Sequence, residues 1–247
     1  MLEASEKAIF SIPAPRTEAG LPAFLASALT VAAKDVRAEL RSRQALSGSL
    51  VFALLTMVIF NFAFDLEGDM KGLAGPGVLW VAIALAGMMA FGHIFAQERE
   101  QGGFEGLLLT PVDRSAVFLG KAAGALLLTF ALELFLLPAF ALFAGVSILS
   151  PGLLVVVVLG TVGYVAVGTL FSAMAVASRS RELLLPLLLL PVATPVIIAA
   201  VEGTRTVLDG EPFGEILPAV TVLAAFDVVF LGLCPFLFEY VMEEMGS

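Results

Sequence analysis

The hydrophobic positions of this chain form long continuous runs instead of short alternating ones. Several runs reach the roughly 20 residues that an α-helix needs to cross the hydrocarbon core of a bilayer. Inside that core the backbone polar groups must be hydrogen-bonded within the protein, which leaves helical bundles and closed β-barrels. Because the runs lack apolar–polar alternation, the pattern predicts an all-α, polytopic membrane bundle. Its six predicted transmembrane helices lie near Ala45–Phe64, Gly77–Ala96, Val117–Ala144, Gly152–Ala177, Leu183–Val201 and Leu217–Tyr240.

The chain before the first of these helices divides into two parts. Residues 1–20 are of mixed character and are predicted to be a flexible cytoplasmic tail. Residues 21–43 are apolar at first and then charged, which predicts an amphipathic helix in the headgroup layer of an anionic leaflet; a plain juxtamembrane anchor is the alternative. The six spans form one transmembrane domain over residues 44–240, and a cytoplasmic tail follows over residues 241–247.

Composition and charge agree with a membrane protein and indicate its orientation. The chain is 60% hydrophobic and 14% charged, whereas soluble domains carry about 25% charged residues. Basic residues concentrate on the cytoplasmic side of membrane proteins, and eleven of the thirteen fall on one predicted side. These are Lys7, Arg16, Lys34, Arg37, Arg41, Arg43, Arg99, Arg114, Lys121, Arg179 and Arg181, against Lys71 and Arg205 on the other side. Both termini are therefore predicted to be cytoplasmic. The connections Asp65–Pro76 and Glu202–Pro218 are then external.

Catalytic chemistry is not predicted for this chain. Cys234 is the only cysteine, so no intrachain disulfide and no C-x-x-C motif can form. The sequence contains no phosphate-binding G-x-x-x-x-G-K-[ST] motif. His93 is the only histidine. It could be a haem ligand or a structural residue. We favour the structural role, because a chain with one histidine cannot form a bis-histidine haem site by itself.

Two acidic residues, Glu133 and Asp227, fall inside the third and sixth spans. A charge at the centre of a bilayer costs roughly 3 kcal/mol on insertion scales, so both side chains are predicted to face protein or water. They could line a cavity, pair across a dimer, or accept hydrogen bonds as neutral acids. The sequence leaves these three roles open.

The polar stretch Gln97–Thr110 has the pattern of a short amphipathic helix. Its apolar positions follow the i, i+3, i+4 spacing of one helix face, acidic residues flank them, and a proline ends the stretch. These residues are Phe104, Leu107 and Leu108, then Glu98, Glu100 and Glu105, and finally Pro111. Such a helix fits a groove on a partner protein or rests on lipid, and its acidic flanks favour the partner because the cytoplasmic leaflet is itself anionic.

A line of small residues marks the start of the third span. Ala116, Gly120 and Gly124 are spaced four residues apart. Small residues at this spacing let two helices approach closely. The fourth span also contains small residues that would allow close helix packing, namely Gly160, Gly163 and Gly168.

Two blocks of sequence carry a resemblance to a known family. The first comprises Ile94-Phe95, Glu98 to Gly103, Glu105, Leu107 to Leu109, Pro111 and Lys121; the second reads R-S-R-E-L-L-L-P-L-L-L-L-P-V-A-T-P from Arg179 to Pro195. Asp35 to Leu40 and Trp80 agree as well. Together they resemble the haem exporter protein B (CcmB) family over most of residues 30–240.

This resemblance implies a permease-like subunit of an ABC-2 type exporter complex in cytochrome c biogenesis, in the bacterial cytoplasmic (inner) membrane. The subunit would form a homodimer and bind a separate cytoplasmic ATPase that holds the ATP. Its coupling helix would contain Glu98, Glu100, Phe104, Glu105, Leu107, Leu108 and Pro111. Further implied partners are a haem-handling membrane subunit, a haem chaperone and membrane lipids, with haem as the handled ligand, no cofactor in this chain and no nucleic acid.

The complex would use ATP hydrolysis to deliver haem or to release a haem-loaded chaperone. Two alternatives share the same topology. One is an ABC-2 type permease that exports a lipid, a drug or a polysaccharide. The other is a non-transporting scaffold that transmits the motion of the ATPase to a haem-handling partner.

Overall fold

The computed structural model describes residues 20–64, 70–100, 112–145, 150–177 and 181–245. These residues form seven α-helices and no strand. The helices are α2 (Leu21–Ser42), α3 (Gln44–Phe64), α4 (Met70–Glu100), α6 (Arg114–Ala144), α7 (Pro151–Ala177), α8 (Arg181–Leu208) and α9 (Phe213–Met245). All except α2 are long and apolar enough to cross a membrane, which confirms the predicted all-α bundle of six spans.

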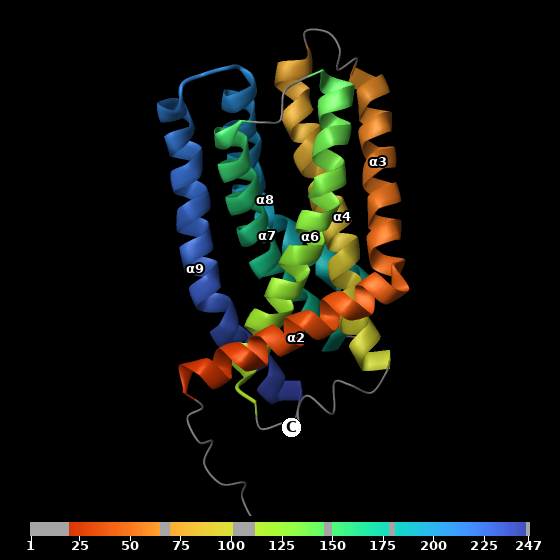
Figure 1. Cartoon of the computed structure of the whole chain (residues 1–247), viewed down its shortest axis with the longest axis vertical. Coiled ribbons are helices and arrows are strands. Elements are labelled where there is room, and N and C mark those ends of the chain that lie inside the picture. Colours follow the sequence, from red (N-terminus) through yellow and green to blue (C-terminus); the bar gives the residue numbers. More distant parts are fainter. Residues whose placement is uncertain (1–19, 65–69, 101–111, 146–149, 178–180, 246–247) are drawn as a thin grey trace, which may run out of the picture.

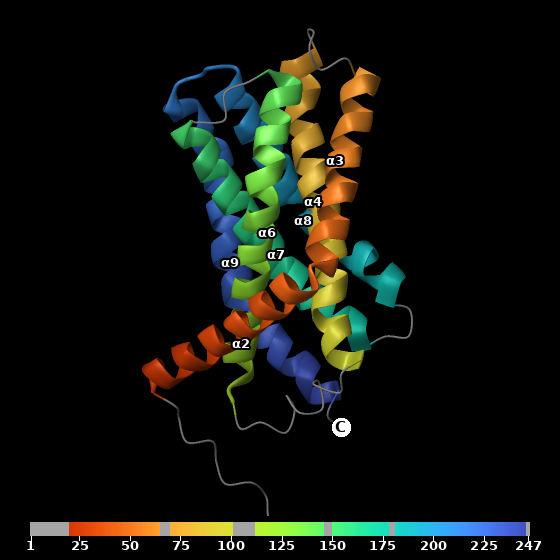
Figure 2. The same cartoon turned by 45° about the vertical axis from the view of Figure 1, so that its right-hand side comes forward.

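The six long helices run alternately up and down, side by side, and α2 lies across one end of the bundle (Figures 1 and 2). The C-terminal end of α9 lies at this same end (Figure 1). Helix α4 ends there and α6 begins there (Figure 1). We call this the α2 end.

The predicted connection Glu202–Pro218 was too long. Helix α8 continues to Leu208 and α9 begins at Phe213, with only residues 209–212 between them. The polar residues that suggested a loop are accommodated at the helix ends. Thr204 is buried, and its hydroxyl accepts a hydrogen bond from Trp80 Nε1 at 2.9 Å. One turn apart along the chain, Arg205 Nε lies 3.7 Å from Asp209 Oδ2. Helix α4 likewise begins at Met70, inside the predicted connection Asp65–Pro76.

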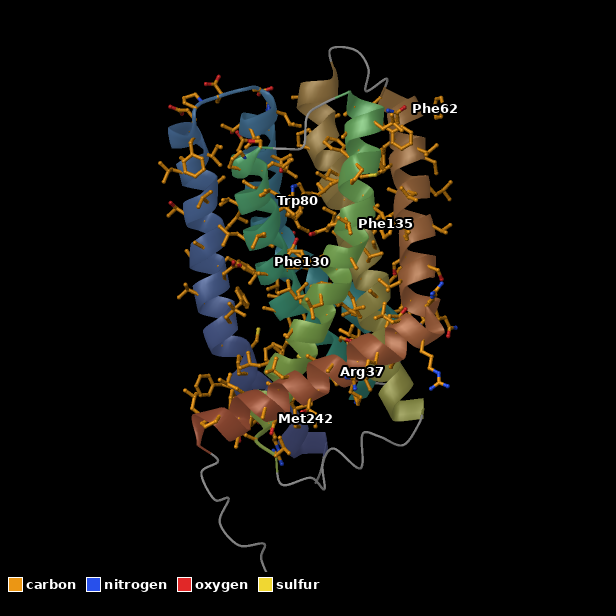
Figure 3. The ribbon with its side chains drawn as sticks, in the orientation of Figure 1. Arg37, Phe62, Trp80, Phe130, Phe135 and Met242 are labelled. Carbon is orange, nitrogen blue, oxygen red and sulfur yellow. The ribbon has the colours of Figure 1, made fainter. Side chains whose placement is uncertain are left out.

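The outer surface of the bundle carries large apolar side chains. Phe62 is 84% exposed and Phe135 is 58% exposed, whereas Trp80 is buried and lies between helices (Figure 3). A soluble monomer rarely exposes contiguous apolar patches. In a bilayer this apolar surface would contact the hydrocarbon chains of lipids and not water.

Aromatic rings pack closely on glycines between α4 and α7. The rings of Trp80, Phe91 and Tyr164 each press on a glycine of the facing helix, at Gly160, Gly168 and Gly87 respectively. A Cβ at Gly87 would lie 2.7 Å from Tyr164 Cε1, and a Cβ at either of the other two glycines would overlap the opposing ring. One hydrogen bond crosses this contact from the Tyr164 hydroxyl, which donates to the Ala84 carbonyl at 2.5 Å. We call this arrangement the ring–glycine interface.

Candidate functional site

The predicted coupling helix lies mostly outside the described residues. Glu98 and Glu100 belong to the last turn of α4, which continues to Glu100. Placing these two residues in a separate short helix was therefore wrong; they extend a transmembrane helix beyond its apolar part. The other predicted coupling residues are outside the described part of the chain: Phe104, Glu105, Leu107, Leu108 and Pro111.

After this connection the chain enters α6 through a side-chain cap. The carboxylate of Asp113 accepts a hydrogen bond from the backbone N–H of Ser115 at 2.8 Å. An aspartate at this position satisfies one of the backbone donors that the first turn of a helix leaves unpaired. The start of α6 is thereby fixed at the α2 end.

Helix α2 is docked on α6 through the predicted line of small residues. A Cβ at Gly120 would lie 2.5 Å from the Ala28 carbonyl oxygen and 2.7 Å from Val31 Cβ. At Gly124 the nearest atoms also belong to α2. The predicted close approach of two helices is confirmed here, and the partner is α2.

An ion pair reinforces this contact. Lys121 Nζ lies 3.0 Å from Asp35 Oδ2, and the lysine side chain is only 1% exposed. Lys121 lies within α6, as the predicted third span implied, and is covered by α2. Its pairing with Asp35 could not be read from the sequence, because the two residues are 86 positions apart. We call α2, the start of α6 and this ion pair the α2–α6 clamp.

A sharp elbow joins α2 to α3. Arg43 adopts a left-handed backbone conformation with φ of 54° and ends α2. The buried side chain of Glu39 then accepts a hydrogen bond from the backbone N–H of Leu46 at 2.8 Å, in the first turn of α3. A carboxylate at a helix N-terminus satisfies a free donor and interacts favourably with the helix dipole. Glu39 therefore holds the elbow, a role that the sequence did not suggest.

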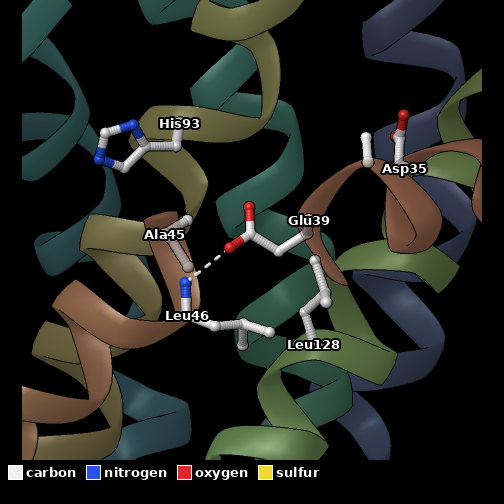
Figure 4. A pocket seen from close by; sticks show the side chains of 8 residues that line it. Asp35, Glu39, Ala45, Leu46, His93 and Leu128 are labelled. Carbon is white, nitrogen blue, oxygen red and sulfur yellow. Dashed lines mark hydrogen bonds between the residues drawn. The ribbon is translucent and has the colours of Figure 1, made fainter. Parts of the chain in front are cut away.

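His93 lines a small recess beneath this elbow. The same recess is lined by Asp35, Glu39, Ala45, Leu46, Ala90 and Leu128, among others (Figure 4). The side chain of His93 is exposed near the α2 end of α4. Within the described ranges, no cluster of three or more His, Cys, Asp or Glu side chains could hold a metal ion. The favoured structural role of His93 stays a prediction.

The intramembrane acids Glu133 and Asp227 are buried inside the bundle and do not face lipid. Glu133 is 2% exposed and accepts a hydrogen bond through Oε1 from the hydroxyl of Thr161, while its Oε2 has no partner. Asp227 is 5% exposed, and its unpartnered Oδ1 lies 2.5 Å from where a Cβ at Gly163 would be. Because Thr161 and Gly163 are two residues apart on α7, the two acids contact different sides of that helix.

Comparison with known proteins assigns the family. Residues 26–244 match the family model described as CcmB protein. The chain is 30% identical to heme exporter protein B of Pseudomonas aeruginosa over 206 residues, which is 83% of this chain and 91% of that protein. It is 28% identical to heme exporter protein B of Paracoccus denitrificans over 82% of this chain and 92% of the relative. The Haemophilus influenzae protein of that name is 26% identical over 84% and 93%. This multi-pass membrane protein therefore belongs to the CcmB family.

Proposed function

We propose that this chain is the permease-like membrane subunit of an ABC transporter complex in cytochrome c biogenesis. The observation that carries the proposal is the family match over residues 26–244, together with relatives named heme exporter protein B. A separate ATPase subunit would hydrolyse ATP, and the complex would use that energy to deliver haem or to release a haem-loaded chaperone. Haem is the handled ligand in this proposal and not a resident cofactor.

The orientation that we propose places the α2 end in the cytoplasm of a bacterial cell, at its inner membrane. Basic residues favour this side. Among the described residues, Arg37, Arg41 and Arg114 lie on α2 or at the start of α6, at the α2 end (Figure 1). The predicted coupling residues between α4 and α6 then face the cytoplasm, where an ATPase subunit can reach them.

Assembly would involve several copies and partners. We propose a homodimer of this chain with two ATPase subunits, next to a haem-handling membrane subunit and a haem chaperone. The apolar outer faces of the bundle, which include Phe62 and Phe135, would contact lipid or a second copy. Glu133 and Asp227, which are buried within the bundle of one chain, would line an internal path.

The ATPase contact can be tested by copurification from the native host. A tagged chain is expected to retain the ATPase subunit, and Leu107→Glu is expected to lose most of it, because the charge falls on the predicted apolar ridge. Leu109→Glu is the matched control: at about 100° per residue it points away from Phe104, Leu107 and Leu108. Equal retention of the ATPase by both variants would contradict the coupling-helix assignment.

A non-transporting scaffold is the second candidate. The ring–glycine interface favours it, because aromatic rings fill the contact between α4 and α7 and leave no path for a porphyrin there. Haem uptake by vesicles that contain the purified complex separates the two functions. ATP-driven haem movement supports the permease, and ATPase activity without haem movement supports the scaffold.

A further inference from the structure

Helix α2 presents three different faces around its circumference. The first face contacts the bundle and includes Ala28, Val31, Ala32, Asp35 and Glu39. On a helical wheel at about 100° per residue these positions fall within a sector of roughly 100°. Most of the remaining residues of α2 are exposed.

The exposed part of α2 divides into an apolar face and a basic face. Leu25 is 50% exposed, Leu29 is 68% exposed and Leu40 is 58% exposed; they fall within about 60° of each other on the wheel. The exposed residues Arg37 and Arg41 lie roughly 100° further round. An apolar face beside a basic face is the arrangement of a helix that lies in the membrane interface.

The acids of α2 do not neutralise this basic face. Asp35 pairs with Lys121 of α6 through Oδ2 at 3.0 Å and with its neighbour Lys34 through Oδ1 at 3.3 Å. Glu39 points toward α3, where it accepts the hydrogen bond from Leu46. Both carboxylates thus make contacts on the bundle side, and among the described residues Arg37 and Arg41 form no ion pair with either of them. In Figure 3, Arg37 lies on α2 across the α2 end of the bundle.

We propose that Arg37 and Arg41 form a binding site for the phosphate groups of anionic phospholipids. The guanidinium group matches phosphate geometry through paired N–H donors. The neighbouring leucines place the site at the depth where lipid phosphates lie, because they occupy the edge of the hydrocarbon. A nucleic acid or an acidic peptide would use the arginines but would leave this leucine face in water. The inference requires only that the bundle spans a membrane, and does not rest on haem handling.

Lipid bound at this site would stabilise the whole bundle. Helix α2 is held to α6 by the α2–α6 clamp and to α3 by the Glu39 elbow. A ligand that binds the folded state shifts the unfolding equilibrium toward that state. Anionic lipid is therefore expected to raise the thermal stability of the full chain.

The test compares the purified full chain in nanodiscs of phosphatidylcholine with the same chain in nanodiscs that also contain phosphatidylglycerol. The wild-type Tm is expected to be higher with phosphatidylglycerol. The variant Arg37→Gln/Arg41→Gln is expected to lose this increase and to bind phosphatidylglycerol on the order of tenfold more weakly. Arg205→Gln, at the opposite end of the bundle, is the control and is expected to keep the increase.

Two results would overturn the proposal. The first is an unchanged response of the double variant to phosphatidylglycerol. The second is that inorganic phosphate added to phosphatidylcholine nanodiscs reproduces the stabilisation, which would identify a site for free anion and not for lipid. If the double variant does not fold, native mass spectrometry of the wild-type chain in mixed lipid decides: enrichment of phosphatidylglycerol supports the site, and equal retention of both lipids rejects it.

Discussion

The ring–glycine interface and the α2–α6 clamp use glycine for opposite purposes. Between α4 and α7, glycines make room for large aromatic side chains, so that the helices are held apart by rings that fill the space between them. Between α2 and α6, Gly120 removes the side chain altogether and brings the two helices into direct contact with the Ala28 carbonyl and Val31. Small residues thus serve shape complementarity in one place and close backbone approach in the other.

The polar groups differ in the same way. At the ring–glycine interface they are neutral, as in the bond from the Tyr164 hydroxyl to the Ala84 carbonyl. At the clamp they are charged, with Lys121 paired to Asp35. A buried ion pair is costly to desolvate, and the clamp lies at the end of the bundle, where Asp35 retains 14% exposure. The comparison suggests that charge holds helices at the membrane edge and shape holds them inside.

The largest expected effect follows from removing one charge of the clamp. Asp35→Leu removes the carboxylate that lies 3.0 Å from Lys121 Nζ, whose side chain is 1% exposed, and the loss of one partner from a buried pair typically costs about 3–5 kcal/mol. Thermal unfolding in detergent is expected to show a large decrease in Tm. The double variant Asp35→Leu/Lys121→Leu is expected to lose much less, since no charge remains buried. A single variant as stable as the wild type would show that charge does not hold the clamp.

An intermediate effect is expected from a methyl group at the ring–glycine interface. Gly168→Ala forces Phe91 to move, because the added Cβ would overlap its ring, and overpacking of this kind costs about 1–3 kcal/mol. Gly232→Ala is the matched control, because a Cβ there meets nothing within 4 Å. The change in the free energy of unfolding should be destabilising for Gly168→Ala and stabilising for Gly232→Ala, because alanine favours a helix where space allows. Equal stabilities would mean that the rings are free to shift.

The smallest effect on stability is expected at Glu133, a third kind of contact between helices. Glu133→Gln keeps an acceptor for the Thr161 hydroxyl, so the free energy of unfolding should change by less than about 1 kcal/mol, the value of one neutral hydrogen bond. If the carboxyl lines a working path, c-type cytochrome levels in the host should nevertheless fall. Normal levels would leave Glu133 with a packing role only.

The six spans were predictable because each apolar run has to match the thickness of the bilayer. The ends of these helices were not, because a helix that leaves the hydrocarbon keeps its hydrogen bonds in water, as α8 does as far as Leu208. The small-residue line at Gly120 indicated a close contact but not its partner.

The roles of Lys121 and Glu39 could not be predicted. Each depends on a residue or backbone group that folding brings near: Asp35 for the lysine, and the start of α3 for the glutamate. Of the candidate site residues, the sequence correctly kept Glu133 and Asp227 away from lipid. The sequence wrongly assigned Glu98 and Glu100 to a separate short helix, whereas they belong to the last turn of α4.

The long sequence separation within the clamp has a consequence for biosynthesis. Asp35 is synthesised 86 residues before Lys121. The two membrane helices α3 and α4 must therefore be made before the lysine that pairs with Asp35 is added to the chain. During that interval α2 has no α6 to dock on. The lysine in turn enters the membrane region at the start of α6 and loses contact with water only when α2 closes over it. Docking of α2 on α6 can therefore begin only after α3 and α4 have been made.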